Sequence, residues 1–179
     1  MALFAAGGMG SHGPRAGAPG FEGAQRMGDA LAARTVQALT NFVLTNRLTF
    51  GLVGAEVTLP ALQARVSNGV RVRPWLARRL LPVEPVTFLQ GIRLGNALWL
   101  STPCDFSAEL ALSLKAAATE HQLAAVVTSF NGDYVGYVIP AKYYTLDGYE
   151  PRTMSFFGPQ LPECFVAVLG ELTAALADR

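Results

Sequence analysis

The sequence predicts an α/β domain in which helices pack in layers on a mixed β-sheet. Segments with apolar residues at helical spacing alternate with short apolar or alternating segments typical of strands. The alternation lacks strict βαβ regularity, which favours a mixed sheet over a purely parallel one. At 179 residues the chain has the length of one domain, so residues 1–179 are treated as a single domain with a sizeable core.

The first third of the chain is predicted to run strand, loop, helix, strand. Residues 3–6 are apolar and short, which predicts a buried strand, and the glycine- and proline-rich residues 7–20 predict a loop. Residues 21–46 carry apolar residues at 3.6-residue spacing and predict a long helix, and residues 49–59 predict a strand. A domain that opens directly on a buried strand looks truncated, so we expect an incomplete catalytic domain.

The rest of the chain continues this alternation. The predicted elements are an edge strand at 70–73 interrupted by Pro74, a hairpin of 86–94 and 97–101 turning at Gly95-Asn96, a helix at 107–121, a buried strand at 123–130, a strand at 134–139 and a last helix beginning near Pro162.

Composition limits the function classes. Hydrophobic residues make up 51% and charged residues 15%, against roughly 25% charged in a typical soluble domain. Either much of the chain is buried, or part of its surface is covered by another molecule or segment. A net charge of +1 predicts no nucleic-acid partner. Two cysteines make no disulfide framework, no apolar run reaches the ~18 residues of a membrane span, and no secretory signal is present. The compartment therefore stays open.

Residues 8–13, GMGSHG, form a G-x-G-x-x-G pattern after the first predicted strand. A dinucleotide site needs a helix that begins at once, and Pro14, Gly17 and Pro19 prevent it. A loop that allows close backbone approach is favoured over nucleotide binding.

A basic cluster, Arg71, Arg73, Arg78 and Arg79, lies beside Trp75. Nucleic acid or lipid headgroups could bind such a cluster. A solvated face is favoured, because no other feature indicates nucleic acid.

Asp105 follows a predicted buried strand and precedes a helix, where ligands commonly bind in α/β sheets. Two interpretations weigh evenly: Asp105 is a ligand or base, or Asp105 or Ser107 caps the helix. Cys104 is interpreted as a small buried hydrophobe rather than a nucleophile.

The strongest feature is a tyrosine-rich segment at 131–149. All five tyrosines of the chain fall there, at Tyr134, Tyr137, Tyr143, Tyr144 and Tyr149. Their spacing fits neither one strand face nor one helix face, which favours a functional role over core packing alone.

This segment resembles the neutral/alkaline, non-lysosomal ceramidase family. Residues 131–138 (NGDYVGYV), Tyr144, 148–150 (GYE) and 157–159 (FGP) resemble the family pattern N-x-Y-x-x-Y-[VI]-T-T, then E-E-Y, then Y-E-[GA]-x-S-T-x-[FY]-G-P. Upstream, 100–107 (LSTPCDFS) resembles its l-P-x-E-[FP]-[TS] segment, and 4–14 resembles its strand and G-D-x-[SN]-P loop. The resemblance spans most of the chain, as the C-terminal part of the family's catalytic domain.

The resemblance implies a zinc amidohydrolase that cleaves ceramide into sphingosine and a fatty acid. Tyr137 falls at the family's tyrosine ligand of zinc, Asp105 falls at its glutamate ligand, and Tyr149 falls at a catalytic, substrate-contacting tyrosine. We therefore expect the side chains of Asp105 and Tyr137 to lie close together. Gly13 aligns with the family's loop serine, and Ser11 lies close by, so both are assigned to substrate binding.

The sequence departs from the family in several places. The family's two histidine ligands lie upstream of any matched segment, and neither His12 nor His121 takes their place. One residue is inserted before Tyr134, Pro140 replaces a threonine, and no immunoglobulin-like domain follows the match. These departures indicate a divergent member.

Two main hypotheses follow. The first is a ceramidase-like zinc amidohydrolase acting on an N-acyl amide of a sphingolipid or related lipid, completed by a missing N-terminal half or a second subunit. The second is a non-catalytic ceramidase-like domain that binds a ligand or partner in the same groove. A nucleotide-binding module is a third, weaker reading. By resemblance we expect a secreted, periplasmic or membrane-associated protein that can associate with a membrane surface.

Overall fold

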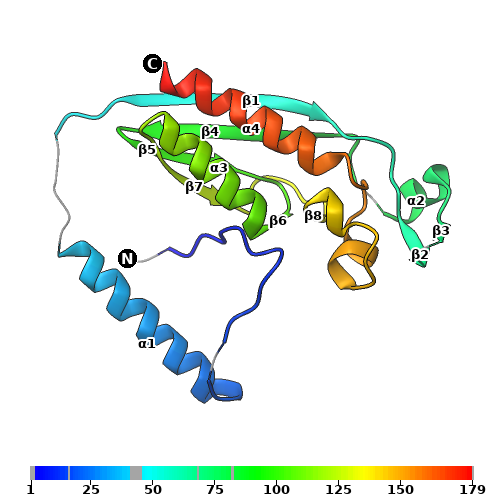
Figure 1. Cartoon of the computed structure of the whole chain (residues 1–179), viewed down its shortest axis with the longest axis horizontal. Helices are drawn as coiled ribbons and strands as arrows, with labels where there is room; N and C mark the ends of the chain where they lie inside the picture. Colours follow the sequence, from blue (N-terminus) through cyan, green and yellow to red (C-terminus); the bar gives the residue numbers. More distant parts are fainter. Residues whose placement is uncertain (1–2, 16, 41–45, 68, 82, 179) are drawn as a thin grey trace. The chain divides into compact units, whose positions relative to one another are not determined.

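The computed structural model describes all residues except 1–2, 16, 41–45, 68, 82 and 179 (Figure 1). The described chain forms two compact units. The larger comprises Met1–His12 and Thr49–Arg179, and the smaller comprises Gly13–Leu48. Each unit is described by itself, so the assignment of residues 1–179 to one domain stays a prediction.

A four-stranded mixed sheet forms the centre of the larger unit, in the order β1-β4-β5-β7. Its strands are β1 (Phe50–Thr58), β4 (Val86–Leu94), β5 (Ala97–Ser101) and β7 (Ala124–Thr128). The pairs β1–β4 and β4–β5 are antiparallel, and β5–β7 is parallel. Gly95 turns the β4–β5 hairpin with a φ of 64°, a conformation that glycine adopts without strain. The predicted mixed α/β architecture is confirmed.

Two helices, α3 (Ala108–Glu120) and α4 (Leu161–Ala177), pack against one face of this sheet and against each other (Figure 1). The strands show why one face is covered, since side chains alternate between the two faces of a strand. In β5, Leu98 and Leu100 are fully buried, whereas Trp99 between them is partly exposed. Phe165 and Leu169 of α4 complete the core on the covered face.

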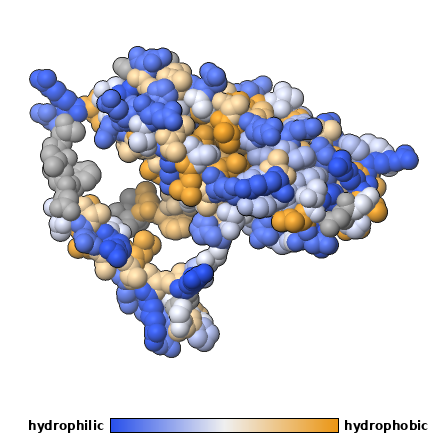
Figure 2. Space-filling model, viewed as in Figure 1, coloured by the Kyte–Doolittle hydropathy of each residue, from blue (hydrophilic) through white to orange (hydrophobic). Residues whose placement is uncertain are grey.

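Two small sheets and several short helices lie beside the main sheet. They are β2 (Arg65–Ser67) with antiparallel β3 (Val70–Arg71), β6 (Asp105–Phe106) with parallel β8 (Tyr137–Val138), α2 (Pro74–Leu80), the 3₁₀-helix η1 (Ala141–Tyr143) and the π-helix η2 (Tyr149–Met154). In Figure 2, hydrophobic residues gather in a patch at the middle of the visible face of the larger unit.

The smaller unit contains helix α1 (Gly20–Leu39), in which Gly23 is the one buried residue. The predicted helix at 21–46 is confirmed as far as Leu39, and residues 41–45 lie outside the described part of the chain. Among the helices described, none has the length and apolar character needed to cross a membrane.

The predicted buried strand at residues 3–6 is wrong. Leu3 and Phe4 are 87% and 85% exposed, and the segment forms no strand. Its bonds to the rest of the unit begin with the carbonyl of Ala6, which accepts from the amide of Ser129 at 2.9 Å. An apolar segment forms a strand only when another strand lies beside it to accept and donate backbone hydrogen bonds. The apolar composition of residues 3–6 was therefore not enough to predict a strand.

Two other strands are shorter or more open than predicted. The strand predicted at 123–130 runs over Ala124–Thr128 and is not buried throughout, because Val126 faces the uncovered side of the sheet. The strand predicted at 134–139 forms only at Tyr137–Val138. The segment predicted at 70–73 pairs at Val70–Arg71 as β3, and Pro74 is the first residue of α2.

Candidate functional site

The pairing of β6 with β8 places Asp105 directly beside Tyr137. The two residues are Cα partners in a parallel ladder, and the amide of Asp105 donates to the carbonyl of Gly136 at 3.0 Å. Paired residues of neighbouring strands lie about 4.8 Å apart and point to the same face. The next pair, Phe106 and Val138, is buried in the core and anchors the ladder. The expected closeness of Asp105 and Tyr137 is therefore confirmed.

The carboxylate of Asp105 is only 5% exposed and is surrounded by phenols. The hydroxyl of Tyr134 donates a hydrogen bond to Oδ2 of Asp105 at 2.8 Å. Burial, followed by the charge of Asp105, raises the pKa of Tyr137. Burial and the hydrogen bond to Asp105 raise the pKa of Tyr134 as well, so both phenols stay protonated beside the carboxylate.

Tyr149 completes this cluster from the first residue of η2. Its ring meets the ring of Tyr137 edge-on, with centroids 5.9 Å apart and an interplanar angle of 82°. Tyr149 is 57% exposed, so the cluster opens to solvent on its side. Of the tyrosine-rich segment, Tyr134 and Tyr137 lie beside Asp105, and Tyr149 packs on Tyr137.

The remaining two tyrosines have other surroundings. Tyr144 is buried, donates to the carbonyl of Gln63 at 3.2 Å and lies under the guanidinium of Arg65, 3.9 Å from its ring centroid. Tyr143 is partly exposed near Lys142. Only part of the tyrosine cluster thus belongs to the candidate site.

Arg65 ties the segment that carries Tyr149 to strand β2. Its guanidinium donates to the carbonyl of Pro151 at 2.6 Å and to the carbonyl of Tyr144. These bonds bracket residues 144–151 from both ends. No sequence motif indicated this residue, because the bond joins positions 86 residues apart.

Replacing Arg65 by methionine is expected to lower the free energy of unfolding by about 2 kcal/mol, because two carbonyls lose a charged donor. Urea unfolding measures the change. Arg71→Met is the matched control, since exposed Arg71 donates to the side chain of Gln63 at 3.1 Å and to no backbone carbonyl among the described contacts. An equal loss of unfolding free energy in both variants would mean that the bonds from Arg65 to the carbonyls of Tyr144 and Pro151 add no stability.

The glycine loop packs closely on the strand that carries Asp105. The amide of Gly10 donates to the carbonyl of Phe106 at 3.0 Å, and a Cβ on Gly10 would lie 2.6 Å from the carbonyl oxygen of Asp105. A Cβ on Gly8 would lie 2.7 Å from the Cβ of Ala111. These contacts favour the interpretation of the loop as a site of close backbone approach.

Ser11 and Gly13 have different surroundings from those the resemblance implied. The hydroxyl of Ser11 accepts a hydrogen bond from the amide of Ala108 at 3.0 Å, at the start of α3. Gly13 is the first residue of the smaller unit, so its position relative to Asp105 is not described. Their assignment to substrate binding stays a prediction.

The structure distinguishes the two readings of Asp105. Ser107 is the N-cap of α3, and its side chain accepts from the amide of Glu109 at 3.3 Å. Asp105 instead faces the tyrosines. Cys104 is fully buried, and burial raises the pKa of its thiol, which favours the hydrophobe over the nucleophile.

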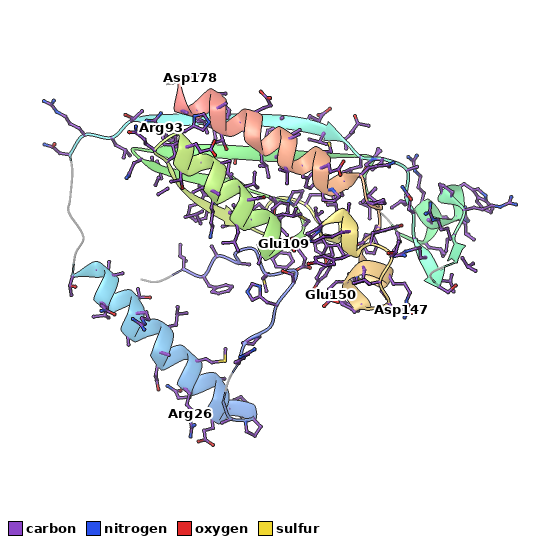
Figure 3. The ribbon with its side chains drawn as sticks, viewed as in Figure 1. Arg26, Arg93, Glu109, Asp147, Glu150 and Asp178 are labelled. Atoms are coloured by element: carbon purple, nitrogen blue, oxygen red, sulfur yellow. The ribbon has the colours of Figure 1, made fainter. Side chains whose placement is uncertain are left out.

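A hollow of about 440 Å³ lies next to this cluster. It is lined by the glycine loop, the first turn of α3 and the segment that leads into η2. Glu109, Asp147 and Glu150 are among its lining residues, and Figure 3 labels them at the start of α3 and near η2. Lys142 pairs with Glu109, and Arg152 pairs with Asp147 at 3.1 Å. The lining combines apolar side chains, such as Ile139 and Leu146, with these acidic ones.

No further metal-binding side chains gather around Asp105 in the described part of the chain. Within the described part of the chain, no three His, Cys, Asp or Glu side chains lie close enough to hold a metal ion. His12 is exposed, and exposed His121 follows the last residue of α3. The basic cluster is a separate surface on β3 and α2, with Arg71, Arg78 and Arg79 exposed, as expected for a solvated face.

No protein-family model matches the sequence, and no curated protein matches it either. A solved structure does match: the crystal structure of neutral ceramidase from Pseudomonas aeruginosa, with a TM-score of 0.62 over 88% of this chain at 16% identity. The chain has the fold of part of a neutral ceramidase.

A second solved structure, a ceramidase complexed with C2, matches with a TM-score of 0.50 over 54% of the chain at 20% identity. The chain spans 32% of the first ceramidase chain and 16% of the second. At these identities the comparison establishes the ceramidase-like fold of this portion. The roles of Asp105, Tyr137 and Tyr149 remain predictions.

Proposed function

We propose that the chain carries part of a zinc-dependent amidohydrolase site of the ceramidase type. Its substrate would be the linear amide bond of an N-acyl lipid, such as a sphingolipid. The observation that carries the proposal is the register of β6 and β8, which sets Asp105 beside Tyr137 with Tyr149 at the open edge. The ceramidase-like fold supports the same conclusion.

The donor groups fit half of a zinc site. Zinc binds carboxylate oxygen and imidazole nitrogen, usually with four ligands in a tetrahedron. Asp105 would supply a carboxylate oxygen and Tyr137 a phenolate oxygen from neighbouring strands. The remaining positions would be filled by histidines outside this cluster, from another part of the polypeptide or a second subunit.

Zinc, when bound, would polarise the amide carbonyl and activate water. Tyr137 must lose its phenol proton to become an anionic ligand, and its raised pKa means that a nearby cation has to favour that loss. Tyr149 is an exposed residue, and its hydroxyl would donate a hydrogen bond to the oxyanion that develops on the amide oxygen. The hollow beside Tyr149 would receive one arm of the substrate.

Replacing Tyr137 by phenylalanine is expected to abolish zinc binding and to lower amide hydrolysis by about 100-fold or more, because a ligand is lost. The measurement uses the chain with zinc, and with imidazole added for the open coordination positions. Zinc affinity is read by competition with a chromophoric chelator, and hydrolysis with a fluorogenic N-acyl sphingosine analogue.

Tyr143→Phe serves as the control for zinc affinity, since Tyr143 has no contact with Asp105 among the interactions described. Zinc affinity that survives Tyr137→Phe would contradict the proposal.

A second use of this surface is the non-catalytic binding of a ligand or partner. One observation favours it: the described residues supply only two of the donors that zinc needs. Binding of the lipid analogue without zinc dependence and without hydrolysis would select this alternative.

A further inference from the structure

We infer that Tyr134 is the positioning residue of this site. Its hydroxyl holds Oδ2 of Asp105, so that the other carboxylate oxygen is presented to a metal. This inference rests on the proposed function, and it assigns a role to a residue outside the set of ligands and substrate contacts named above.

Tyr134 contacts Asp105 directly through its hydroxyl. The phenol of Tyr134 donates to Oδ2 of Asp105 at 2.8 Å, a length typical of a strong hydrogen bond to a charged acceptor. Asp105 is 5% exposed, so little water competes for that oxygen. Oδ2 is therefore occupied whenever Tyr134 is in place.

Neighbouring residues hold Tyr134 in place. Its ring stacks on Phe130, with centroids 5.9 Å apart and planes at 25°. Its amide donates to Oδ1 of Asp133 at 2.7 Å. Phe130 has a φ of 61°, a conformation that strains a residue with a Cβ. The neighbouring Asn131 side chain donates to the carbonyls of Thr128 and Ser129. Such strain persists only where surrounding contacts impose it.

The hydrogen bond from Tyr134 limits how the Asp105 carboxylate can turn. A free aspartate can turn about its terminal bond and offer either oxygen or both. A phenol fixed on Oδ2 restricts that rotation and leaves the other oxygen for a second partner. Removing a group that hydrogen-bonds to a metal ligand commonly lowers metal affinity about 10–100-fold.

The test is Tyr134→Phe, which keeps the stacked ring and removes only the hydroxyl. Zinc affinity of the chain, measured with imidazole by chelator competition, is expected to fall about 10-fold or more. Tyr143→Phe is the matched control, because Tyr143 and Tyr134 are equally exposed at 38% and the same atom is removed. The control is expected to bind zinc as the unaltered chain does.

A second readout needs no metal. Thermal unfolding is measured for Tyr134→Phe, Asp105→Ala and the double variant. The loss of Tm caused by Tyr134→Phe is expected to shrink toward zero once Asp105 is absent, because the two groups then have no bond to lose.

The outcomes separate the two proposals. No zinc binding by the unaltered chain overturns the proposed metal site, while the Tm comparison still decides whether Tyr134 holds Asp105. Equal zinc affinity of Tyr134→Phe and the unaltered chain, or an equal loss of Tm with and without Asp105, overturns the positioning role. Weaker zinc binding by Tyr134→Phe, together with a loss of Tm that disappears once Asp105 is absent, supports the positioning role.

Discussion

Replacing Gly136 by alanine is expected to lower the free energy of unfolding by about 3 kcal/mol or more. Gly136 has a φ of 85°, which residues with a Cβ rarely adopt. A Cβ built there would lie 2.4 Å from the carbonyl oxygen of Met154, a backbone atom that cannot turn aside. Urea unfolding followed by circular dichroism measures the loss.

Gly132→Ala separates strain from collision in this experiment. Gly132 has a similar φ of 79°, but a Cβ there would meet no atom within 4 Å. Its replacement is expected to cost about 1 kcal/mol, from the backbone conformation alone. Equal losses of unfolding free energy for Gly136→Ala and Gly132→Ala would contradict a destabilising collision between the added Cβ and Met154. Gly136 also precedes Tyr137, so the same variant is expected to displace Tyr137 from Asp105.

Replacing Phe165 by alanine is the second large effect, with an expected loss of about 3–5 kcal/mol. Phe165 is fully buried in α4, where that helix covers the sheet. The variant removes a ring from a packed core and leaves a cavity that its neighbours fill only in part. Urea unfolding of the larger unit gives the magnitude.

Phe21→Ala is the control for the loss of a phenylalanine ring, because Phe21 is 96% exposed on α1. Its replacement is expected to change the unfolding free energy by less than about 0.5 kcal/mol. If Phe165→Ala lowers the unfolding free energy by less than about 1 kcal/mol, the packing of Phe165 does not stabilise α4 on the sheet.

Long periodic segments made much of this fold predictable. The β4–β5 hairpin follows from two apolar runs around Gly95-Asn96, and its bounds match the predicted ones. Helices α3 and α4 follow from apolar spacing and from start signals, with Ser107 as the cap and Pro162 in the first turn. In these elements local preference and burial favour the same structure.

Local patterns could not reveal the pairing that builds the site. Strands β6 and β8 have two residues each, too few for any alternation to be read. The closeness of Asp105 and Tyr137 was predictable only from the resemblance to ceramidases. The hydroxyl of Tyr134 on Asp105 was missed, although its place three residues before Tyr137 in the tyrosine motif was the available signal.

In the N-terminal segment, the sequence predicted a strand that the structure does not form. Residues 3–6 have the composition of a buried strand, yet Leu3 and Phe4 are exposed. A strand requires a partner with free backbone groups, and such a partner is a property of the tertiary structure. Apolar content therefore could not determine the state of this segment.

The short ladder between β6 and β8 also bears on how the protein folds. Tyr134 and Asp105 lie 29 positions apart, and α3 and β7 occupy the chain between the two strands. Bringing them together closes a long loop, whose entropic cost is recovered only after α3 and β7 have docked. The cluster should thus be among the last contacts to form during folding. The amide protons of Asp105 and Ser107, which donate across this ladder, mark that late step.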